Sequence, residues 1–267
     1  EWAELHTTRK IIEEDSSKLL TRKYVGIREY NPKIFHNLPL PEFDDTGFVG
    51  RKKDIKEITE LILNKKNQII SVVGNGGMGK TSTVIKILYD LIEKDENPFE
   101  AVIWLTLKTK TLSHGEFVEI KDGLKKMSDV IEKSKQIMVS DSDTNAMETV
   151  IEFMNTFSTL LVLDNLETIN TGDINDFLRN IPENSKVLIT SRLGVGEFEV
   201  RQKIDGLEKN DAIAYYRELS KYYGLELHQQ SDSEIYKIIH DNLYNNPLSI
   251  KWFISGIYSG TSAKQML

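Results

Sequence analysis

The feature that most constrains the fold is a glycine-rich segment, residues 74–81, which lies between an apolar run and a helical pattern. It matches G-x-x-x-x-G-K-[ST] at every position. The apolar run Gln68–Val73 predicts a buried strand, and the spacing of Val84, Leu88 and Leu91 predicts a helix that begins at Lys80. In this order, glycines let backbone N–H groups turn inward around a phosphate, which the helix N-terminus also attracts. The strand and the helix argue against a glycine-rich turn that matches by chance.

We expect three kinds of group to share the chemistry of this loop. Backbone N–H groups would surround the phosphates, Lys80 would reach the β- and γ-phosphates, and Thr81 would ligate Mg²⁺. The predicted nucleotide-binding residues of the loop are Gly74, Asn75, Gly76, Gly77, Met78, Gly79, Lys80, Thr81 and Ser82.

A second candidate is the acid at the end of the apolar run Leu160–Asp164. Downstream of a phosphate-binding loop, a carboxylate is needed to hold the Mg²⁺ that Thr81 also contacts, so Asp164 is a predicted metal ligand. The next residue is Asn165, where vigorous P-loop ATPases usually place a second acid that activates water. We therefore expect slow hydrolysis. Glu167 is the nearest alternative base, although an exposed loop glutamate explains it equally well.

A third candidate follows the predicted strand Lys186–Thr190, which delivers Ser191 and Arg192 to its carboxyl edge. Ligands bind at that edge of doubly wound sheets, and a guanidinium complements phosphate oxygens, so Arg192 can sense the γ-phosphate. The alternative is a solvated arginine after an edge strand, and the presence of the other two motifs favours the sensor. The predicted catalytic residues are Lys80, Asp164, Arg192 and Glu167.

Apolar runs and helical patterns alternate through the middle of the chain, which is typical of an α/β fold with a parallel sheet. The expected strands are Gln68–Val73, Ala101–Leu107, Leu160–Asp164, Lys186–Thr190 and a weaker Arg201–Ile204. The expected helices are one from about Lys52, then Lys80–Ile92, Ala146–Phe157 and Ile174–Asn180. The polar stretch Lys108–Thr144, with a possible hairpin over Ser113–Glu119, has no assigned role.

We expect three parts along the chain. Residues 1–45 would be a helical stub and a linker, because three of the six prolines fall between Pro32 and Pro41. Residues 46–206 would form the nucleotide-binding domain, and residues 207–267 a helical subdomain. In that subdomain a helix over Asp211–Tyr223 would end at Gly224. Later helix starts are marked by the capping box of Ser231 and Glu234 and by Asn246 and Pro247. Trp104, Trp252 and Phe253 are expected in the core.

Composition narrows the function classes. The absence of cysteine excludes disulfide scaffolds, thiol catalysis and cysteine-based zinc sites. The formal net charge of −7 argues against broad binding to nucleic acid or to anionic lipid. The chain has no apolar run of membrane-spanning length and no signal-peptide pattern, so we expect a cytoplasmic protein. Because it begins with Glu1 and ends directly after an apolar helix, we also expect it to be part of a longer protein.

Short motifs in a fixed order carry a family resemblance. Residues 48–51, Phe-Val-Gly-Arg, precede the glycine loop, and residues 161–165, 190–192 and 246–248 follow it as Leu-Val-Leu-Asp-Asn, Thr-Ser-Arg and Asn-Pro-Leu. In this order the chain resembles, over about residues 40–260, the nucleotide-binding domain of STAND-class P-loop NTPases, in the NB-ARC-like branch. The resemblance implies a P-loop sheet of the ASCE type with a small helical subdomain. The strand before the loop would lie between Lys186–Thr190 and Arg201–Ile204, with Leu160–Asp164 beyond Lys186–Thr190 and Ala101–Leu107 at the far edge.

The resemblance also implies further site residues. Val49, Gly50 and Arg51 would lie against the adenine and ribose, mostly through backbone contacts, and Pro247 would pack on the adenine. The alternatives are a solvated charge for Arg51 and a simple helix start for Pro247. In relatives a winged-helix domain follows, whose histidine commonly contacts the ADP β-phosphate. That domain would lie beyond Leu267, and none of the five histidines here takes its place.

The function that the resemblance implies is a switch. ADP would hold one arrangement and ATP, with Mg²⁺, another, so that homo-oligomerisation on activation brings effector domains together. The effector would lie upstream and the ligand sensor downstream of this chain, with a slow ATPase at most. The preferred setting is prokaryotic antiphage defence. Alternatives are a STAND transcription regulator, an AAA+-type ATPase with continuous turnover, and a nucleotide or small-molecule kinase.

Overall fold

The computed structural model describes residues 34–41, 43, 46–94, 96–106, 146–166, 171–196 and 199–267. The chain divides into two compact units, each described by itself. One contains residues up to 39, 61–71 and 88–201, and the other contains residues 40–60, 72–87 and 202–267. The predicted N-terminal helix, the stretch 108–144 and Glu167 lie outside the described residues. The predicted boundaries at residues 45 and 206 stay predictions.

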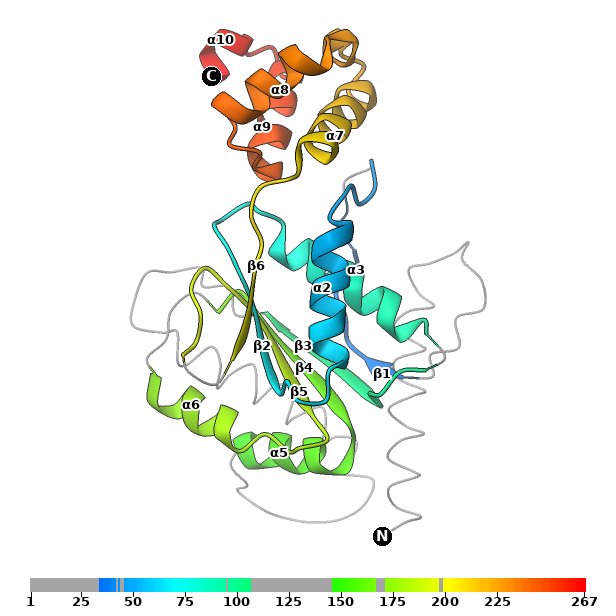
Figure 1. Ribbon diagram of the computed structural model, residues 1–267, viewed down its shortest axis with the longest axis vertical. Coiled ribbons are helices and arrows are strands. Elements are labelled where there is room, and N and C mark those ends of the chain that lie inside the picture. The colour runs from blue at the N-terminus through cyan, green and yellow to red at the C-terminus, as the bar shows by residue number, and fades with distance from the viewer. Residues whose placement is uncertain are drawn as a thin grey trace. The chain divides into compact units, whose positions relative to one another are not determined.

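Six strands form one sheet in the order β1-β3-β4-β5-β2-β6 (Figure 1). Their bounds are β1 Phe35–His36, β2 Ile69–Val73, β3 Ala101–Thr106, β4 Thr159–Asp164, β5 Lys186–Ser191 and β6 Val200–Lys203. The pairs β1–β3, β3–β4 and β4–β5 are parallel. The predicted P-loop order is confirmed, since β2 lies between β5 and β6 and β4 lies beyond β5.

The predicted far-edge position of Ala101–Leu107 was wrong, because β1 lies outside β3. The short strand comes from the segment that the prolines marked as a linker. After it, the Asn37 side chain continues the pairing, since its Nδ2 donates to the Trp104 carbonyl (3.0 Å) and its Oδ1 accepts from the Trp104 N–H (2.6 Å). The prolines of this segment predicted an irregular backbone. They gave no sign that the Asn37 side chain would make the hydrogen bonds to β3 that the backbone of a further strand residue would otherwise make.

The core of the first unit lies between the sheet and two helices, α5 Ala146–Thr156 and α6 Thr171–Arg179. Alternate residues of the central strands, such as Leu161 and Leu163, pack against Phe153 and Phe177. The strand residues between them, which point to the other face of the sheet, are equally buried, since every residue of β4 and β5 is buried. Strands buried on both faces explain why these segments read as continuous apolar runs.

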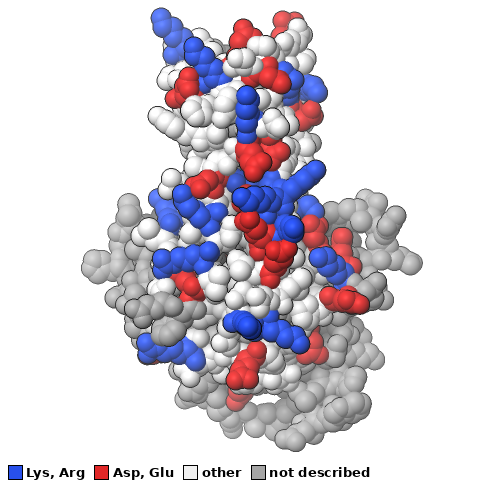
Figure 2. All heavy atoms as spheres, in the orientation of Figure 1, with Lys and Arg blue, Asp and Glu red and all other residues white. Residues whose placement is uncertain are grey.

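The helices beside the glycine loop are α2 Lys52–Leu63 and α3 Lys80–Ile92, and the bounds of α3 are those predicted. On the outside of α2, exposed pairs join Lys53 to Glu57 and Lys56 to Glu60, each at 3.9 Å. Figure 2 shows Lys and Arg side chains interspersed with Asp and Glu over the described part of this face. Exposed pairs at this spacing contribute about 0.3–0.5 kcal/mol each.

The helical subdomain consists of α7 Lys209–Tyr222, the 3₁₀ turn Glu226–Gln229, α8 Asp232–Asp241, α9 Pro247–Tyr258 and α10 Ala263–Met266. The capping box is confirmed, since Ser231 and Glu234 each bond to the other's backbone. Asn246 is the N-cap of α9 and Pro247 its first residue, also as predicted. The core includes Tyr216, whose ring stacks on Phe253 at 6.2 Å.

The expected burial of Trp252 was wrong, whereas Trp104 and Phe253 are buried as expected. The Trp252 side chain is 62% exposed. Helix α9 is apolar on several faces, and Ile250, Phe253 and Ile254 form the stripe that packs into the core. Trp252 lies off this stripe, so periodicity rather than hydrophobicity decides its position.

Within the described ranges, none of the helices has both the length and the apolar character needed to cross a membrane.

The burial of His36 on β1 predicts a pH-dependent stability. The side chain is almost fully buried, and desolvation lowers its pKa to about 4. The unfolded chain, with a histidine pKa near 6.5, therefore binds the extra proton first as the pH falls. We expect the wild type to lose up to about 3 kcal/mol of unfolding free energy between about pH 6.5 and pH 4 through this residue. A His36→Asn variant should not show that loss in denaturant titrations, and parallel pH curves would contradict the prediction.

Candidate functional site

The glycine loop lies between the end of β2 and the start of α3, as predicted. Gly77 and Gly79 adopt φ values of 77° and 82°, in the left-handed region that favours glycine. A Cβ at Gly77 would lie 2.8 Å from both the Asn246 Oδ1 and the Leu248 Cβ, whereas a Cβ at Gly79 would meet nothing within 4 Å. The loop is therefore closely covered by α9 at one point and open at another.

Each carbonyl of the loop from residue 74 to residue 79 accepts a hydrogen bond from the protein. The donors are Lys80 Nζ to Gly74 (2.7 Å) and Asn75 (3.0 Å), Asn246 Nδ2 to Gly76 (3.0 Å), Leu248 N to Gly77 (3.3 Å), Arg51 Nη2 to Met78 (2.7 Å) and Thr83 N to Gly79 (2.9 Å). Because a peptide is planar and trans, a carbonyl held on one side directs the following N–H to the other. Such a run of N–H groups is an anion-binding concavity.

Arg51 fixes the start of α2 to this loop. Its backbone adopts φ 64°, and its guanidinium donates to Asp54 Oδ2 (2.9 Å) as well as to the Met78 carbonyl. The side chain is 6% exposed. The alternative of a solvated charge is therefore wrong, because this guanidinium is buried and paired. Its predicted contact with the ribose stays a prediction.

Asp211 holds the same segment from the first turn of α7. Its Oδ2 accepts a hydrogen bond from the Arg51 backbone N–H at 3.1 Å. A Cβ at Gly50, where φ is 74°, would lie 2.3 Å from this oxygen. Glycine at residue 50 is thus required both by its backbone conformation and by the close approach of Asp211. Sequence reasoning missed Asp211, because an acid in the first turn of a helix is common for the helix dipole alone.

A pocket within the second unit lies beside the loop. It encloses about 100 Å³ and is open to solvent. The lining residues are Phe43, Gly47, Phe48, Val49, Arg51, Met78, Gly79, Ser82, Thr83, Leu207, Tyr215 and Pro247. The wall combines aromatic and aliphatic side chains with a few polar groups, which suits a flat, partly apolar ligand.

The pocket contains six of the predicted residues and several that were missed. Val49, Arg51, Met78, Gly79, Ser82 and Pro247 were predicted. Phe43 and Phe48, whose rings meet edge to face at 5.3 Å, were not. Tyr215 was also missed, because its sequence pattern is that of a core residue of α7, where it is also buried. Pro247 both begins α9 and lines the pocket, so its two interpretations are compatible.

In the first unit, the Asp164 carboxylate lies buried at the end of β4. Thr190 on β5 donates its hydroxyl to Asp164 Oδ1 at 2.7 Å, and the same hydroxyl oxygen accepts from the Asn165 N–H at 2.8 Å. Asn165 adopts φ 65°, which asparagine tolerates better than most residues. A carboxylate oxygen held in this way fits the hard oxygen ligands that Mg²⁺ prefers. Thr81 belongs to the other unit, so a shared ion stays a prediction.

Arg192 follows β5 directly, and its side chain is exposed. Its predicted contact with a γ-phosphate is therefore open to test by substitution without disturbing the core. Glu167, the alternative base, lies outside the described residues.

Comparisons with known proteins point to one family. Residues 51–212 match the model of the NB-ARC domain. The transcription activator GutR of Bacillus subtilis is 26% identical over 198 residues, which cover 69% of this chain and 22% of GutR. The "Probable disease resistance protein RF45" of Arabidopsis thaliana is 28% identical over 150 residues, covering 56% of this chain and 14% of RF45. The chain thus spans less than a quarter of either relative.

Among solved structures, the Walker-type ATPase PABY2304 of Pyrococcus abyssi superposes with a TM-score of 0.54 at 12% identity. The match covers 82% of this chain and 70% of that protein. At this identity the likeness shows the fold alone.

The contact between Asp211 and Arg51 gives a testable prediction. Asp211→Ala leaves a buried backbone N–H without its acceptor, which should lower the free energy of unfolding by about 1–3 kcal/mol. Asp211→Asn keeps an acceptor oxygen and should lose less. Asp205→Ala is the matched control, because Asp205 forms an exposed pair with Lys203 and should lose at most about 0.5 kcal/mol. Equal losses for Asp205→Ala and Asp211→Ala in denaturant unfolding would contradict the prediction.

Proposed function

This chain belongs to the NB-ARC family, and we propose that it is an ATP/ADP-dependent switch that couples nucleotide exchange or slow hydrolysis to oligomerisation and effector activation. The observation that carries the proposal is the way in which the glycine loop is held. Two of its carbonyls accept from Asn246 and Leu248 of the helical subdomain, and that subdomain also lines the pocket through Leu207, Tyr215 and Pro247. A nucleotide bound here would contact both the glycine loop and the helical subdomain.

We assign the parts of the nucleotide to residues as follows. The adenine and ribose occupy the pocket beside Val49, Gly50, Arg51 and Pro247, and the phosphates lie in the glycine loop. Lys80 neutralises the β- and γ-phosphates from the position where it now binds the loop carbonyls. Thr81 and Asp164 supply oxygen ligands for Mg²⁺, which would neutralise phosphate charge when bound.

The switch depends on contacts that ATP makes and ADP does not. ATP and ADP differ in the γ-phosphate, and a ligand shifts a conformational equilibrium only by its difference in affinity for the two states. Two of the loop carbonyls, those of Gly76 and Gly77, are hydrogen-bonded directly to the N-terminus of α9, so a change in the loop on phosphate binding alters contacts that hold the helical subdomain. Arg192, as the residue that contacts the γ-phosphate, would distinguish the two nucleotides.

Slow hydrolysis is supported by the residue after Asp164. Asn165 carries a carboxamide, which cannot accept a proton from water at neutral pH, and its backbone N–H is bound to Thr190. Glu167 remains the candidate base. The AAA+-type alternative needs continuous turnover, for which a carboxylate next to Asp164 would be expected.

Two relatives support two biological settings. The disease resistance protein of Arabidopsis supports a defence receptor, and we place this chain in prokaryotic antiphage immunity, acting in the cytoplasm with effector and sensor domains outside the chain. The transcription activator GutR supports the alternative of a transcription regulator. In the full-length protein, specific retention of duplex DNA would favour the regulator, and nucleotide-dependent oligomers without DNA would favour the receptor.

Replacing Lys80 tests the phosphate site. Lys80→Ala should weaken ATP and ADP binding by at least about 100-fold, because the cation that meets the phosphates is lost. Circular dichroism should stay close to that of the wild type, because this side chain lies outside the core, and the loss of its two hydrogen bonds to the loop carbonyls should lower the unfolding midpoint only slightly. Lys53→Ala, which removes an exposed lysine of α2, is the matched control. Unchanged affinity of Lys80→Ala in calorimetry would refute the assignment of the loop.

Replacing Asn165 tests the slow hydrolysis. Asn165→Asp should raise ATP turnover by about tenfold or more, because a general base contributes at least about 100-fold when it is well placed. Aspartate tolerates the left-handed backbone at this residue. Asn165→Gly keeps the backbone conformation but supplies no base, so it should turn over ATP no faster than the wild type. Equal rates for the two variants, or wild-type turnover at ordinary enzyme rates of about 10 s⁻¹, would count against the proposal.

A further inference from the structure

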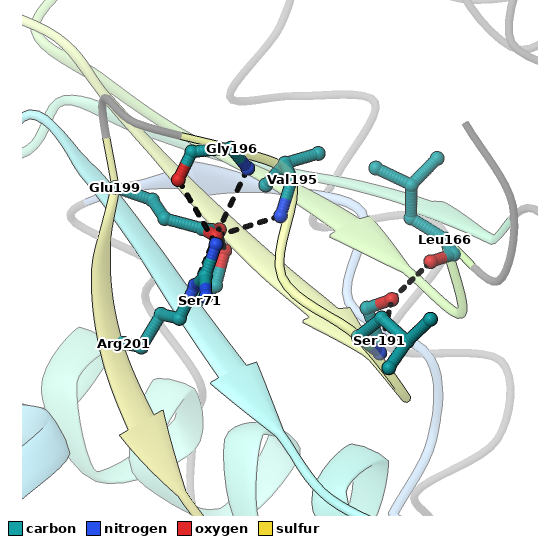
Figure 3. Close-up of polar contacts among 8 residues, drawn as sticks. Ser71, Leu166, Ser191, Val195, Gly196, Glu199 and Arg201 are labelled. Carbon is teal, nitrogen blue, oxygen red and sulfur yellow. Dashed lines mark hydrogen bonds and ion pairs between the residues drawn. The ribbon is translucent and has the colours of Figure 1, made fainter. Parts of the chain in front are cut away.

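A buried carboxylate lies behind the segment that carries Arg192. The side chain of Glu199 is 1% exposed. It accepts hydrogen bonds from the backbone N–H groups of Val195 (2.7 Å) and Gly196 (3.2 Å), from Arg201 Nε (2.5 Å) and from the Ser71 hydroxyl (Figure 3). A buried charge is stable only when it is paired and hydrogen-bonded, and these donors meet that need. Burial raises the pKa of Glu199, but the hydrogen bonds outweigh it and lower the pKa overall, so the group is charged at neutral pH.

The donors show what this carboxylate connects. Ser71 lies on β2, the strand that leads into the glycine loop, whereas Val195 and Gly196 belong to the segment after β5. A Cβ at Gly194 would lie 2.1 Å from Arg201 Nε and 2.2 Å from Glu199 Oε1, so only glycine allows this approach. Glu199 therefore ties the backbone that follows Arg192 to β2, the strand between β5 and β6.

A second anchor lies on the other side of Arg192. The hydroxyl of Ser191, at the end of β5, donates to the Leu166 carbonyl and accepts from the Leu193 N–H at 3.3 Å (Figure 3). The Leu166 N–H in turn donates to the Thr190 carbonyl at 2.9 Å. Ser191 is buried, whereas Arg192 and Leu193 are exposed. The arginine thus projects from a short exposed stretch that is fixed at both ends.

We infer that Ser191 and Glu199 are positioning residues for Arg192, and that they hold its backbone where the guanidinium can distinguish ATP from ADP. The inference rests on the proposed role of Arg192. Neither residue needs to touch the nucleotide. A long arginine side chain makes a phosphate contact of fixed geometry only when its backbone is itself fixed, because even a small displacement of a contacting group weakens the contact strongly.

The test measures the dissociation constants of ADP and of a non-hydrolysable ATP analogue by calorimetry, with Mg²⁺, for the whole chain. Arg192→Ala is the reference and should lower the preference for the ATP analogue by about tenfold or more. Ser191→Ala and Glu199→Gln should each lower that preference by up to about tenfold, while the ADP constant changes by less than about twofold. Lys203→Ala, at the exposed end of β6, which begins directly after Glu199, should behave as the wild type.

Double variants separate positioning from a general structural role. If Ser191 and Glu199 act through Arg192, then Arg192→Ala combined with either change should lose no more preference than Arg192→Ala alone. Where Glu199→Gln does not fold, Ser71→Ala removes one donor from the same carboxylate and replaces it in the test. Additive losses, or equal losses of ADP and of the ATP analogue, would overturn the inference.

The measurements distinguish a wrong role of Arg192 from a wrong positioning role of Ser191 and Glu199. If Arg192→Ala leaves the preference unchanged, the proposed γ-phosphate role of Arg192 is wrong, and the inference falls with it. If Arg192→Ala removes the preference but Ser191→Ala and Glu199→Gln keep it, only the positioning role is overturned.

Discussion

The constraint on which this structure depends is that a loop able to surround phosphate has few side chains with which to hold itself. Glycine backbone can turn its N–H groups inward, but its carbonyls then need donors from elsewhere. Here those donors are the ammonium of Lys80, the guanidinium of Arg51, the amide of Asn246 and backbone N–H groups. The phosphate cradle is therefore built by its neighbours, and any change in the neighbours is felt by the loop.

Local chemistry could be predicted from the sequence. The bounds of α3 follow from the glycines before it and the apolar period within it, and the starts of α8 and α9 follow from Ser231 and Asn246, whose side chains cap their own helices. The parallel sheet and the order of β3, β4, β5, β2 and β6 were also predictable, because buried strands read as apolar runs and the motif order restricts the topology, whereas β1 at the far edge was missed. The family resemblance was confirmed by the NB-ARC match.

Contacts between distant residues could not be predicted in the same way. The hydrogen bond from the Arg51 N–H to Asp211 joins residues that are 160 positions apart in the sequence. An acid in the first turn of a helix gives no sign of such a distant partner. Glu199 reads as one more charged loop residue until its donors are seen around it. Trp252 shows the opposite error, since its hydrophobicity suggested burial that the helical stripe of α9 does not provide. In each case tertiary packing decides between local alternatives of similar free energy.

The carboxyl end of β5 holds both candidate site residues of the first unit, Asp164 and Arg192. Two consecutive hydroxyls serve two different groups there, since Thr190 bonds to Asp164 and to the Asn165 N–H, whereas Ser191 bonds on both sides of the turn that leads to Arg192. A side chain that points to one face of a strand is followed by one that points to the other, so one strand end can hold the Asp164 carboxylate and the backbone before Arg192 at once. A displacement of β5 would therefore move both groups together, which couples Mg²⁺ binding to γ-phosphate recognition within this proposal.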